Sequence, residues 1–311
     1  MPEQEARILV IKHGAFGDLV QADGILRDIR AFHPGAQITL LTAPAFRKLM
    51  SRCPHVDQVQ TDARSPLWKI TEWLRLARLF KAGQFTKVYD LQNSDRTELY
   101  RKLFFRHARW NGLRVRERQA AALQGLVRQL QNDGIPTECS LSPDVSWMAE
   151  DVDSFLREEG VRTPYIALIP GCAAKHPYKR WPYYAKLAEA LLERGYDVVT
   201  APGPDEIDLA KSIPGHTLLG PNGFLNWFEL AGVLKGASFV VGNDTGPSHV
   251  ASYLGKPGLV LFGPHTSAAK TGICHGSFQA IETEDLKALS VETVLAAVLE
   301  KLPPLGQENC V

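Results

Sequence analysis

The chain has few cysteines and no pattern that pairs them. Its 311 residues contain five, an odd number, and none stands in a C-x-x-C motif. A disulfide framework or a structural zinc site needs paired or regularly spaced cysteines, so both are disfavoured. We therefore expect reduced thiols, as in a cytosolic protein. The five residues are Cys53, Cys139, Cys172, Cys274 and Cys310.

Long apolar runs and an excess of one charge are also missing. No apolar stretch approaches the ~18 residues that a membrane-spanning helix needs. The first apolar run follows acidic residues and has only the length of a strand, so it does not resemble a signal peptide. The formal net charge is +1. No global field therefore favours nucleic acid or a membrane, and such a partner would need a local patch.

Short apolar runs alternate with helical patterns along the whole chain. Hydrophobic residues make up 45% and charged residues 22%, the balance of a globular protein. Strand-like runs followed by amphipathic stretches predict the βαβ rhythm of a parallel sheet. The predicted strands are 7–12, 37–41, 56–60, 87–91, 165–169, 197–200, 239–242 and 259–262. The predicted helices include 19–32, 67–81, 145–159, 183–194, 206–212, 227–235 and 291–301.

The rhythm is interrupted in the middle of the chain and then restarts. Asn132-Asp133-Gly134 and several prolines mark a link there. The length suits two domains of about 150 residues each. We predict an α/β fold with two Rossmann-like domains, an N-terminal one at 1–160 and a C-terminal one at 161–311. In this prediction, the final helix packs either on the second domain or back on the first.

A glycine-bearing turn, Gly14-Ala15-Phe16-Gly17-Asp18, follows the first strand. Glycines at this place permit a tight turn and the close approach of a ligand to the backbone. Asp18 at the helix start is either a cap or a functional carboxylate, and the sequence leaves both open. The pattern is not G-x-G-x-x-G, and no acidic residue ends the second strand, so NAD binding is disfavoured.

Two later loops predict anion binding. Gly171 follows a strand, and Lys179-Arg180-Trp181-Pro182 precedes the next helix, which is typical of an anion site but equally of solvated loop charge. The sharper motif is GNDTGPSH at 242–249, between an apolar strand and a helix. Its backbone N–H groups and the hydroxyls of Thr245 and Ser248 are expected to converge on a diphosphate. His249, one turn into the helix, is either a structural histidine or a ligand contact.

A basic stretch runs from Asp95 to Arg118. It carries eight basic and three acidic residues, a local charge of +5 in a nearly neutral protein. This clustering favours an anionic partner, and a solvated helix face is the alternative.

These elements, in this order, resemble glycosyltransferase family 9, the lipopolysaccharide heptosyltransferases. The matching segments are IKHGAFGDLVQADGILRDIR, IPGCAAKHPYKRWP and GNDTGPSHVASYLGKPGLVLFGP, and together they span nearly the whole chain. The resemblance implies a GT-B fold, with two facing Rossmann-like domains and the active site in the cleft. It also implies an inverting, metal-independent transfer of heptose from ADP-heptose to the inner core of lipopolysaccharide, with no cofactor.

The resemblance assigns roles to particular residues. Asp18 matches the family's general base, and Lys179 the lysine at the donor phosphate and sugar. Gly17 and three residues of the basic stretch are expected on the acceptor side. The remaining donor-side residues are Gly171, Glu206 (at the ribose), Asp244, Thr245, Gly246, Ser248 and His249. The acceptor-side residues of the basic stretch are Arg101, Lys102 and Arg106.

The implied partners are a nucleotide-sugar donor and a membrane-anchored acidic glycolipid, with no nucleic acid. We expect a cytoplasmic protein, with peripheral contact to the inner face of the inner membrane left open. Three alternatives also stay open: another nucleotide sugar, a protein acceptor, or a non-transferase GT-B enzyme such as an epimerase.

The carboxylate of Asp18 would be a weak base, so its positioning beside the acceptor hydroxyl must supply much of its catalytic effect.

Overall fold

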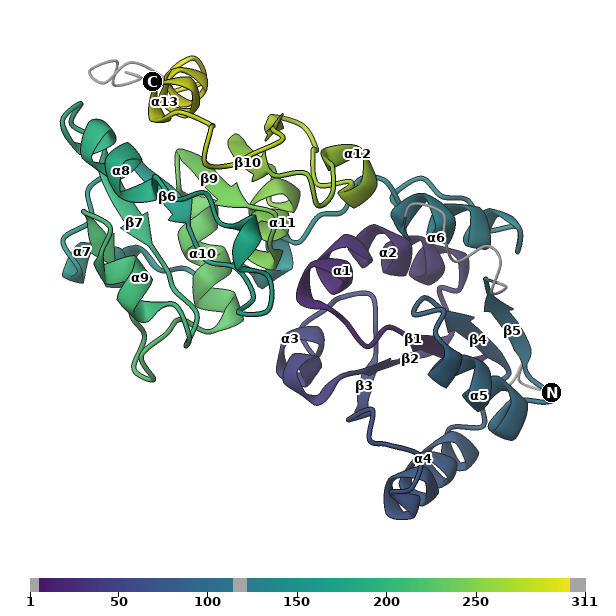
Figure 1. Cartoon of the computed structure of the whole chain (residues 1–311). Coiled ribbons are helices and arrows are strands. Elements are labelled where there is room, and N and C mark those ends of the chain that lie inside the picture. The colour runs from purple at the N-terminus through teal and green to yellow at the C-terminus, as the bar shows by residue number, and fades with distance from the viewer. Residues whose placement is uncertain (1–5, 114–121, 303–311) are drawn as a thin grey trace. The chain divides into compact units, whose positions relative to one another are not determined.

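The computed structural model describes residues 6–113 and 122–302 (Figure 1). The chain forms two compact units, Met1–Pro143 and Asp144–Val311. This boundary lies earlier than the expected one at 160/161, because the connecting segment hydrogen-bonds to the second unit. Val145 N–H donates to the Tyr253 carbonyl at 3.3 Å, and Glu150 N–H donates to the Phe228 carbonyl at 3.2 Å.

The first unit is built on a parallel sheet in the order β3-β2-β1-β4-β5. β1 and β2 are almost entirely buried, as near-continuous apolar runs in a parallel sheet should be. The strands are β1 (Arg7–Ile11), β2 (Gln37–Thr42), β3 (Gln58–Thr61), β4 (Lys87–Asp90) and β5 (Arg109–Gly112).

Helices cover both faces of this sheet (Figure 1). One face packs on α4 and α5 through a cluster that includes Leu9, Ile11, Phe80 and Tyr100. The helix predicted over 19–32 is two helices, with Ala22 ending the first and preceding the second. The helices are α1 (Phe16–Gln21), α2 (Asp23–Phe32), the 3₁₀ turn η1 (Pro44–Phe46), α3 (Arg47–Met50), α4 (Ile70–Gly83), α5 (Asp95–Phe104) and α6 (Ala122–Gln131).

The second unit has a parallel sheet in the order β11-β10-β9-β6-β7-β8. Both outer strands, β8 and β11, are absent from the sequence prediction. The strands are β6 (Tyr165–Ile169), β7 (Asp197–Thr200), β8 (His216–Thr217), β9 (Phe239–Asn243), β10 (Gly258–Phe262) and β11 (Phe278–Glu282).

One face of this sheet is covered by α8 and α13, so the final helix packs within its own unit. The helix predicted over 145–159 is a 3₁₀ turn followed by a short helix. The helical elements are η3 (Ser146–Met148), α7 (Asp153–Glu158), η4 (Pro177–Lys179), α8 (Tyr184–Leu192), α9 (Ile207–Lys211), α10 (Trp227–Gly236), α11 (Gly246–Tyr253), α12 (Ala268–Thr271) and α13 (Val291–Leu299).

Each sheet reverses its winding direction between two central strands, β1 and β4 in the first unit and β6 and β9 in the second. In doubly wound sheets, ligands bind at the carboxyl ends of the strands beside this switch point. The residues after β1, β4, β6 and β9 are therefore the places to look for a site. The helices of the described ranges include none long and apolar enough to cross a bilayer.

Candidate functional site

The switch point of the second unit brings Lys179 and Asp244 together. Asp244 directly follows β9, and Lys179 ends η4 in the loop after β6. The Lys179 ammonium donates to Asp244 Oδ2 at 2.7 Å, with the side chains 21% and 8% exposed. Two residues singled out separately from the sequence thus form a largely buried ion pair, at the strand ends where a ligand is expected.

Two histidines also face the Asp244 carboxylate. His249 Nε2 lies 3.9 Å from Oδ1, and His265 Nε2 lies 3.6 Å from Oδ2. Burial lowers the pKa of His265, and nearby Lys179 lowers it further while Asp244 raises it. His265 is not among the residues predicted from the sequence, although the Gly263-Pro264-His265 turn after an apolar strand is a usable signal. Asp244 is therefore surrounded by basic side chains.

The Asn243 side chain links the loops of this site by hydrogen bonds. Its side chain is fully buried, and its Oδ1 accepts from Trp181 N–H and from the Tyr184 hydroxyl, both at 3.1 Å. Its Nδ2 donates to the carbonyls of Pro170 (2.9 Å) and Gly171 (3.1 Å). An unpaired buried polar group costs about 1–3 kcal/mol, so these bonds hold the loops after β6 and β9 in fixed register.

Ser248 lies in the fold rather than at a surface open to a diphosphate. The side chain is fully buried, and its hydroxyl donates to the Asn243 carbonyl at 2.6 Å. In this structure the Ser248 hydroxyl is bonded within the fold, and its contact with the donor stays a prediction. Thr245 and Gly246 stand at the start of α11 and are half-buried. The N–H groups of a first helical turn have no partner within the helix, although Pro247 in this turn has no N–H to donate. The contact of Thr245 and Gly246 with a donor stays a prediction.

Glu206 lies directly against Gly171 at the same edge of the sheet. Its Oε2 accepts from Gly203 N–H at 3.2 Å. A Cβ added to Gly171 would lie 2.1 Å from Glu206 Oε1, a distance that no side chain tolerates. The carboxylate therefore occupies space that a Cβ at position 171 would take, and a larger residue there would make the Glu206 side chain move. The predicted residues Gly171 and Glu206 are brought together by the structure.

Asp18 occupies the first turn of α1 in the first unit, next to half-buried Gly17. Its Oδ2 accepts from Ala15 N–H at 3.1 Å and lies 3.9 Å from the Lys12 ammonium. Asp18 is the third residue of α1 and accepts from the backbone of the N-cap residue Ala15, as the acidic residue of a capping box does, so it stabilises the helix start without being the N-cap residue itself. The side chain is nevertheless 49% exposed, which leaves the carboxylate accessible to a ligand.

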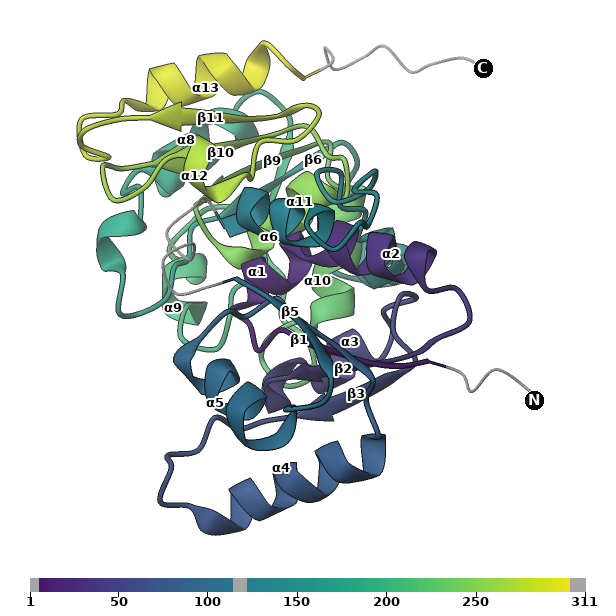
Figure 2. The ribbon, with the colours of Figure 1, turned by 90° about the vertical axis from the view of Figure 1, so that its right-hand side faces the viewer.

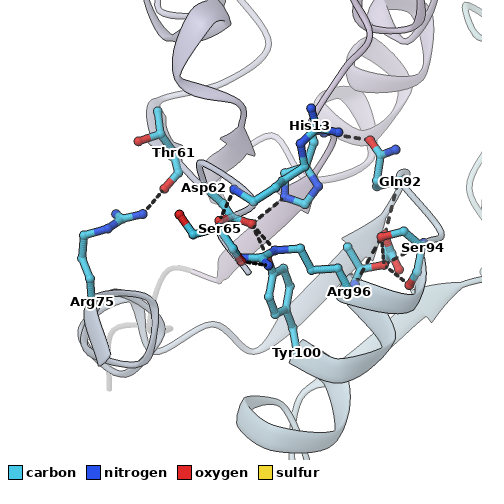
Figure 3. A network of polar contacts seen from close by, with 12 residues as sticks. His13, Thr61, Asp62, Ser65, Arg75, Gln92, Ser94, Arg96 and Tyr100 are labelled. Atoms are coloured by element: carbon cyan, nitrogen blue, oxygen red, sulfur yellow. Dashed lines mark hydrogen bonds and ion pairs between the residues drawn. The ribbon is translucent and has the colours of Figure 1, made fainter. Parts of the chain in front are cut away.

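A buried polar network supports the end of β1 (Figure 3). Asp62 is its centre: Arg96 donates to Oδ2 from Nε at 2.7 Å and to Oδ1 from Nη2 at 2.8 Å. The Tyr100 hydroxyl also donates to Oδ2. Burial alone would raise the pKa of Asp62, but the hydrogen bonds from Arg96 and Tyr100 hold it below the usual value. Trp73 stacks beneath the Arg96 guanidinium at 4.8 Å.

His13 connects this network to the Asp18 turn. Its ring is buried, with Nε2 3.5 Å from Asp62 Oδ2, and its backbone N–H donates to Gln92 Oε1 at 2.9 Å (Figure 3). Burial lowers the pKa of His13 to about 4; Asp62 opposes the shift, and Arg64, Arg96 and Lys12 add to it. Burial also lowers the pKa of the Lys12 ammonium, against the effect of Asp18. His13 is therefore neutral at pH 7.

We expect acid to destabilise the first unit through His13. The folded pKa of about 4 lies below the ordinary 6.5, so the unfolded chain binds a proton first as the pH falls. Stability is then lost between about pH 6.5 and 4, by about 2–3 kcal/mol at pH 4.5. Urea titrations at two pH values should show a smaller loss in His13→Gln than in the wild type. The matched control His107→Gln, at an exposed histidine, should keep the full loss. Equal losses in all three proteins would contradict the assignment.

The basic stretch divides into residues with different surroundings. Arg96 is held in the network around Asp62 and is not an exposed cation. Arg101 and Lys102 both contact Glu98, at 2.6 and 3.7 Å, and Arg106 donates to the Lys102 carbonyl at 3.1 Å. Exposed pairs of this kind contribute little to stability. The members Arg114, Arg116 and Arg118 lie outside the described residues.

Comparisons with known proteins agree with this architecture. The model of glycosyltransferase family 9 (heptosyltransferase) matches residues 115–290, more than half of the chain. Lipopolysaccharide heptosyltransferase 2 of Escherichia coli K12 is 25% identical over 303 residues, covering 83% of each chain. A family 9 glycosyl transferase structure from Veillonella parvula superposes with a TM-score of 0.78 at 20% identity, covering 95% of this chain and 96% of that one.

A solved structure of an E. coli heptosyltransferase, WaaC with ADP, has a TM-score of 0.69 at 20% identity and covers 95% of this chain and 99% of that one. These structures share the fold of this chain. The prediction of an α/β protein of GT-B type is therefore confirmed.

Proposed function

The chain belongs to glycosyltransferase family 9 and is a glycosyltransferase, and we propose that it transfers heptose from ADP-heptose to the inner core of lipopolysaccharide. Its relatives carry the name lipopolysaccharide heptosyltransferase, and one structural neighbour was solved with ADP. The single observation that supports a donor site in the second unit is the Lys179–Asp244 pair at its switch point.

We propose that, when the donor binds, the Lys179 ammonium leaves Asp244 and donates to the diphosphate instead. A phosphate oxygen accepts a charge-assisted hydrogen bond from an ammonium as a carboxylate does, and the backbone donors of the α11 start add to it. Asp244, released from Lys179, then accepts from hydroxyls of the transferred sugar. Glu206, whose carboxylate lies against Gly171, accepts from the ribose hydroxyls. His249 stands beside Asp244 as a second candidate donor contact.

The reaction proposed is a single displacement with inversion. Asp18 takes the proton of the acceptor hydroxyl as its oxygen bonds to the anomeric carbon. The bond from that carbon to the β-phosphate oxygen breaks, and ADP leaves with its electron pair. Lys179 and the start of α11 stabilise the charge that develops on the diphosphate, so we propose that no divalent ion is required. The acceptor would be an acidic glycolipid reached at the cytoplasmic face of the inner membrane.

A thermal-shift screen of ADP-, GDP- and UDP-sugars tests the donor. We expect ADP-heptose alone to raise the melting temperature, because a ligand at 100 times its dissociation constant adds roughly 2.7 kcal/mol. The shift and the transfer rate should both persist in EDTA. A shift with a UDP-sugar instead would favour another transferase or an epimerase. Loss of activity in EDTA, restored by magnesium, would contradict the metal-free mechanism.

Three basic residues in and just after α5 are the predicted contacts of the acceptor, and reversing their charge tests this role. We predict that changing Arg101, Lys102 and Arg106 to Glu raises the Michaelis constant for a water-soluble, deacylated acceptor, because arginine forks match carboxylates and phosphates. The donor's dissociation constant should not change. The control is a matched reversal in the second unit, of exposed Arg157, Arg194 and Lys235. An unchanged acceptor constant would mean that the pairs with Glu98 are only local salt bridges.

A further inference from the structure

The start of α4 exposes a concentrated group of large apolar side chains. Nine such side chains are exposed among the described residues, and four of them fall between 67 and 74. They are Leu67 (64% exposed), Trp68 (79%), Ile70 (67%) and Leu74 (51%), which together we call the α4 patch. Single exposed apolar residues are ordinary, but a contiguous group marks a contact surface.

The patch stands on a rigid base. The opposite side of α4 is anchored by Leu76 and Phe80, which are buried in the core of the first unit. Trp73 packs edge-on to Tyr100 at 5.8 Å, and the Arg75 guanidinium donates to the Thr61 carbonyl at 2.7 Å. Figure 2 shows α4 along the outer edge of this unit, beyond α5. These contacts fix the orientation of α4, and so the apolar side chains of the patch point away from the core of the unit.

Positive charge accompanies the apolar side chains. Residues 63–83 contain five basic residues and one acidic residue, and the acidic one, Glu72, is bound by Arg75. Ile70, Leu74, Arg78 and Lys81 follow helical spacing, so apolar residues pass into cations along one face of α4. Lys69, Arg78 and Lys81 are exposed and form no ion pair within the described ranges. The surface is thus both apolar and cationic.

We propose that the α4 patch docks the enzyme on the surface of an anionic lipid bilayer. A tryptophan has an apolar ring and one N–H, a combination suited to the headgroup region. Apolar side chains flanked by lysine and arginine are the features of peripheral binding to acidic lipid. The inference rests on the proposed function only in that the patch would serve a membrane-anchored acceptor. Its charge favours lipid headgroups over a second copy of this chain, whose own patch would carry the same sign.

Vesicle flotation of the full chain tests this surface. The vesicles contain phosphatidylcholine with or without phosphatidylglycerol, and neither a sugar donor nor a glycolipid, so the result does not depend on the reaction proposed. We expect the wild-type protein to float with the anionic vesicles and to bind the neutral ones weakly. Added salt should reduce binding, because exposed charges are screened over ~8–10 Å at physiological ionic strength.

The decisive variants change the patch and a matched site elsewhere. Trp68→Asp combined with Ile70→Asp should lower partitioning into anionic vesicles by about tenfold or more, with donor affinity unchanged. The control Leu141→Asp changes another exposed apolar residue (55%, against 79% for Trp68 and 67% for Ile70) of the same unit and should bind like the wild type. Wild-type flotation of the double variant would overturn the proposal. So would equal loss in the control, or loss of a dimer as the main effect of the double variant in gel filtration.

Discussion

Asp18→Asn should lower the rate of sugar transfer by about 10²–10⁴ at saturating substrates, the usual effect of losing a general base. The substitution separates the two roles that the geometry allows. An asparagine oxygen can still accept from Ala15 N–H, as Asp18 Oδ2 does at 3.1 Å, but the amide cannot take a proton from the acceptor. The turnover number should therefore fall while the melting temperature and the donor's dissociation constant stay near wild type.

Two comparisons make this result specific. Glu138→Gln neutralises another exposed carboxylate of the first unit and should keep full turnover. Turnover in Asp18→Asn close to that of the wild type would show that the carboxylate serves only as a helix cap. A large drop in melting temperature would show instead that the cap dominates.

Removing the Lys179 ammonium should be nearly as damaging. We expect Lys179→Met to weaken donor binding and to lower kcat/KM by about 10²–10³, because this cation would stabilise charge on the leaving diphosphate. Asp244→Asn should also impair the reaction. Combined, the two changes should cost more than the sum of the single effects, because each single change also removes the 2.7 Å ion pair that donor binding has to break.

The control for charge is Lys235→Met. This exposed lysine lies near the end of α10, just before β9 begins, and so at the sheet edge opposite to Asp244. Its removal should leave donor affinity unchanged. Strictly additive effects of the Lys179 and Asp244 variants, or wild-type affinity in Lys179→Met, would remove this pair from the donor site.

The sequence predicts the central strands and the polar residues at their ends, because apolar runs and punctuating glycines are local signals. The observed β6 matches its predicted range of 165–169. Edge strands are harder to recognise: β8 has two residues, and β11 (FQAIE) is only partly buried. The alternation of apolar and polar residues in β11 is too short to indicate a strand unless its pairing with β10 is known.

Contacts between distant segments are what the sequence could not supply. A count of charges placed Arg96 in an exposed basic stretch, but its partner Asp62 lies 34 residues away and buries it. The spacing of Ser248 put it in the first turn of α11, without showing that its hydroxyl faces the Asn243 carbonyl. Asn243 itself stood in the quoted motif, yet its role appears only when the loops after β6 and β9 are seen together.

The most direct test of the proposed activity is mass spectrometry of the acceptor after incubation with ADP-heptose in EDTA. The acceptor should be lipopolysaccharide truncated in its inner core, and the product should gain one heptosyl residue, with ADP released in equal amount. The anomeric configuration of the new linkage, read by NMR, should be opposite to that of the donor. Two results would contradict the account. In one, no truncated core gains a heptose from ADP-heptose; in the other, the enzyme uses another nucleotide sugar or a protein acceptor instead.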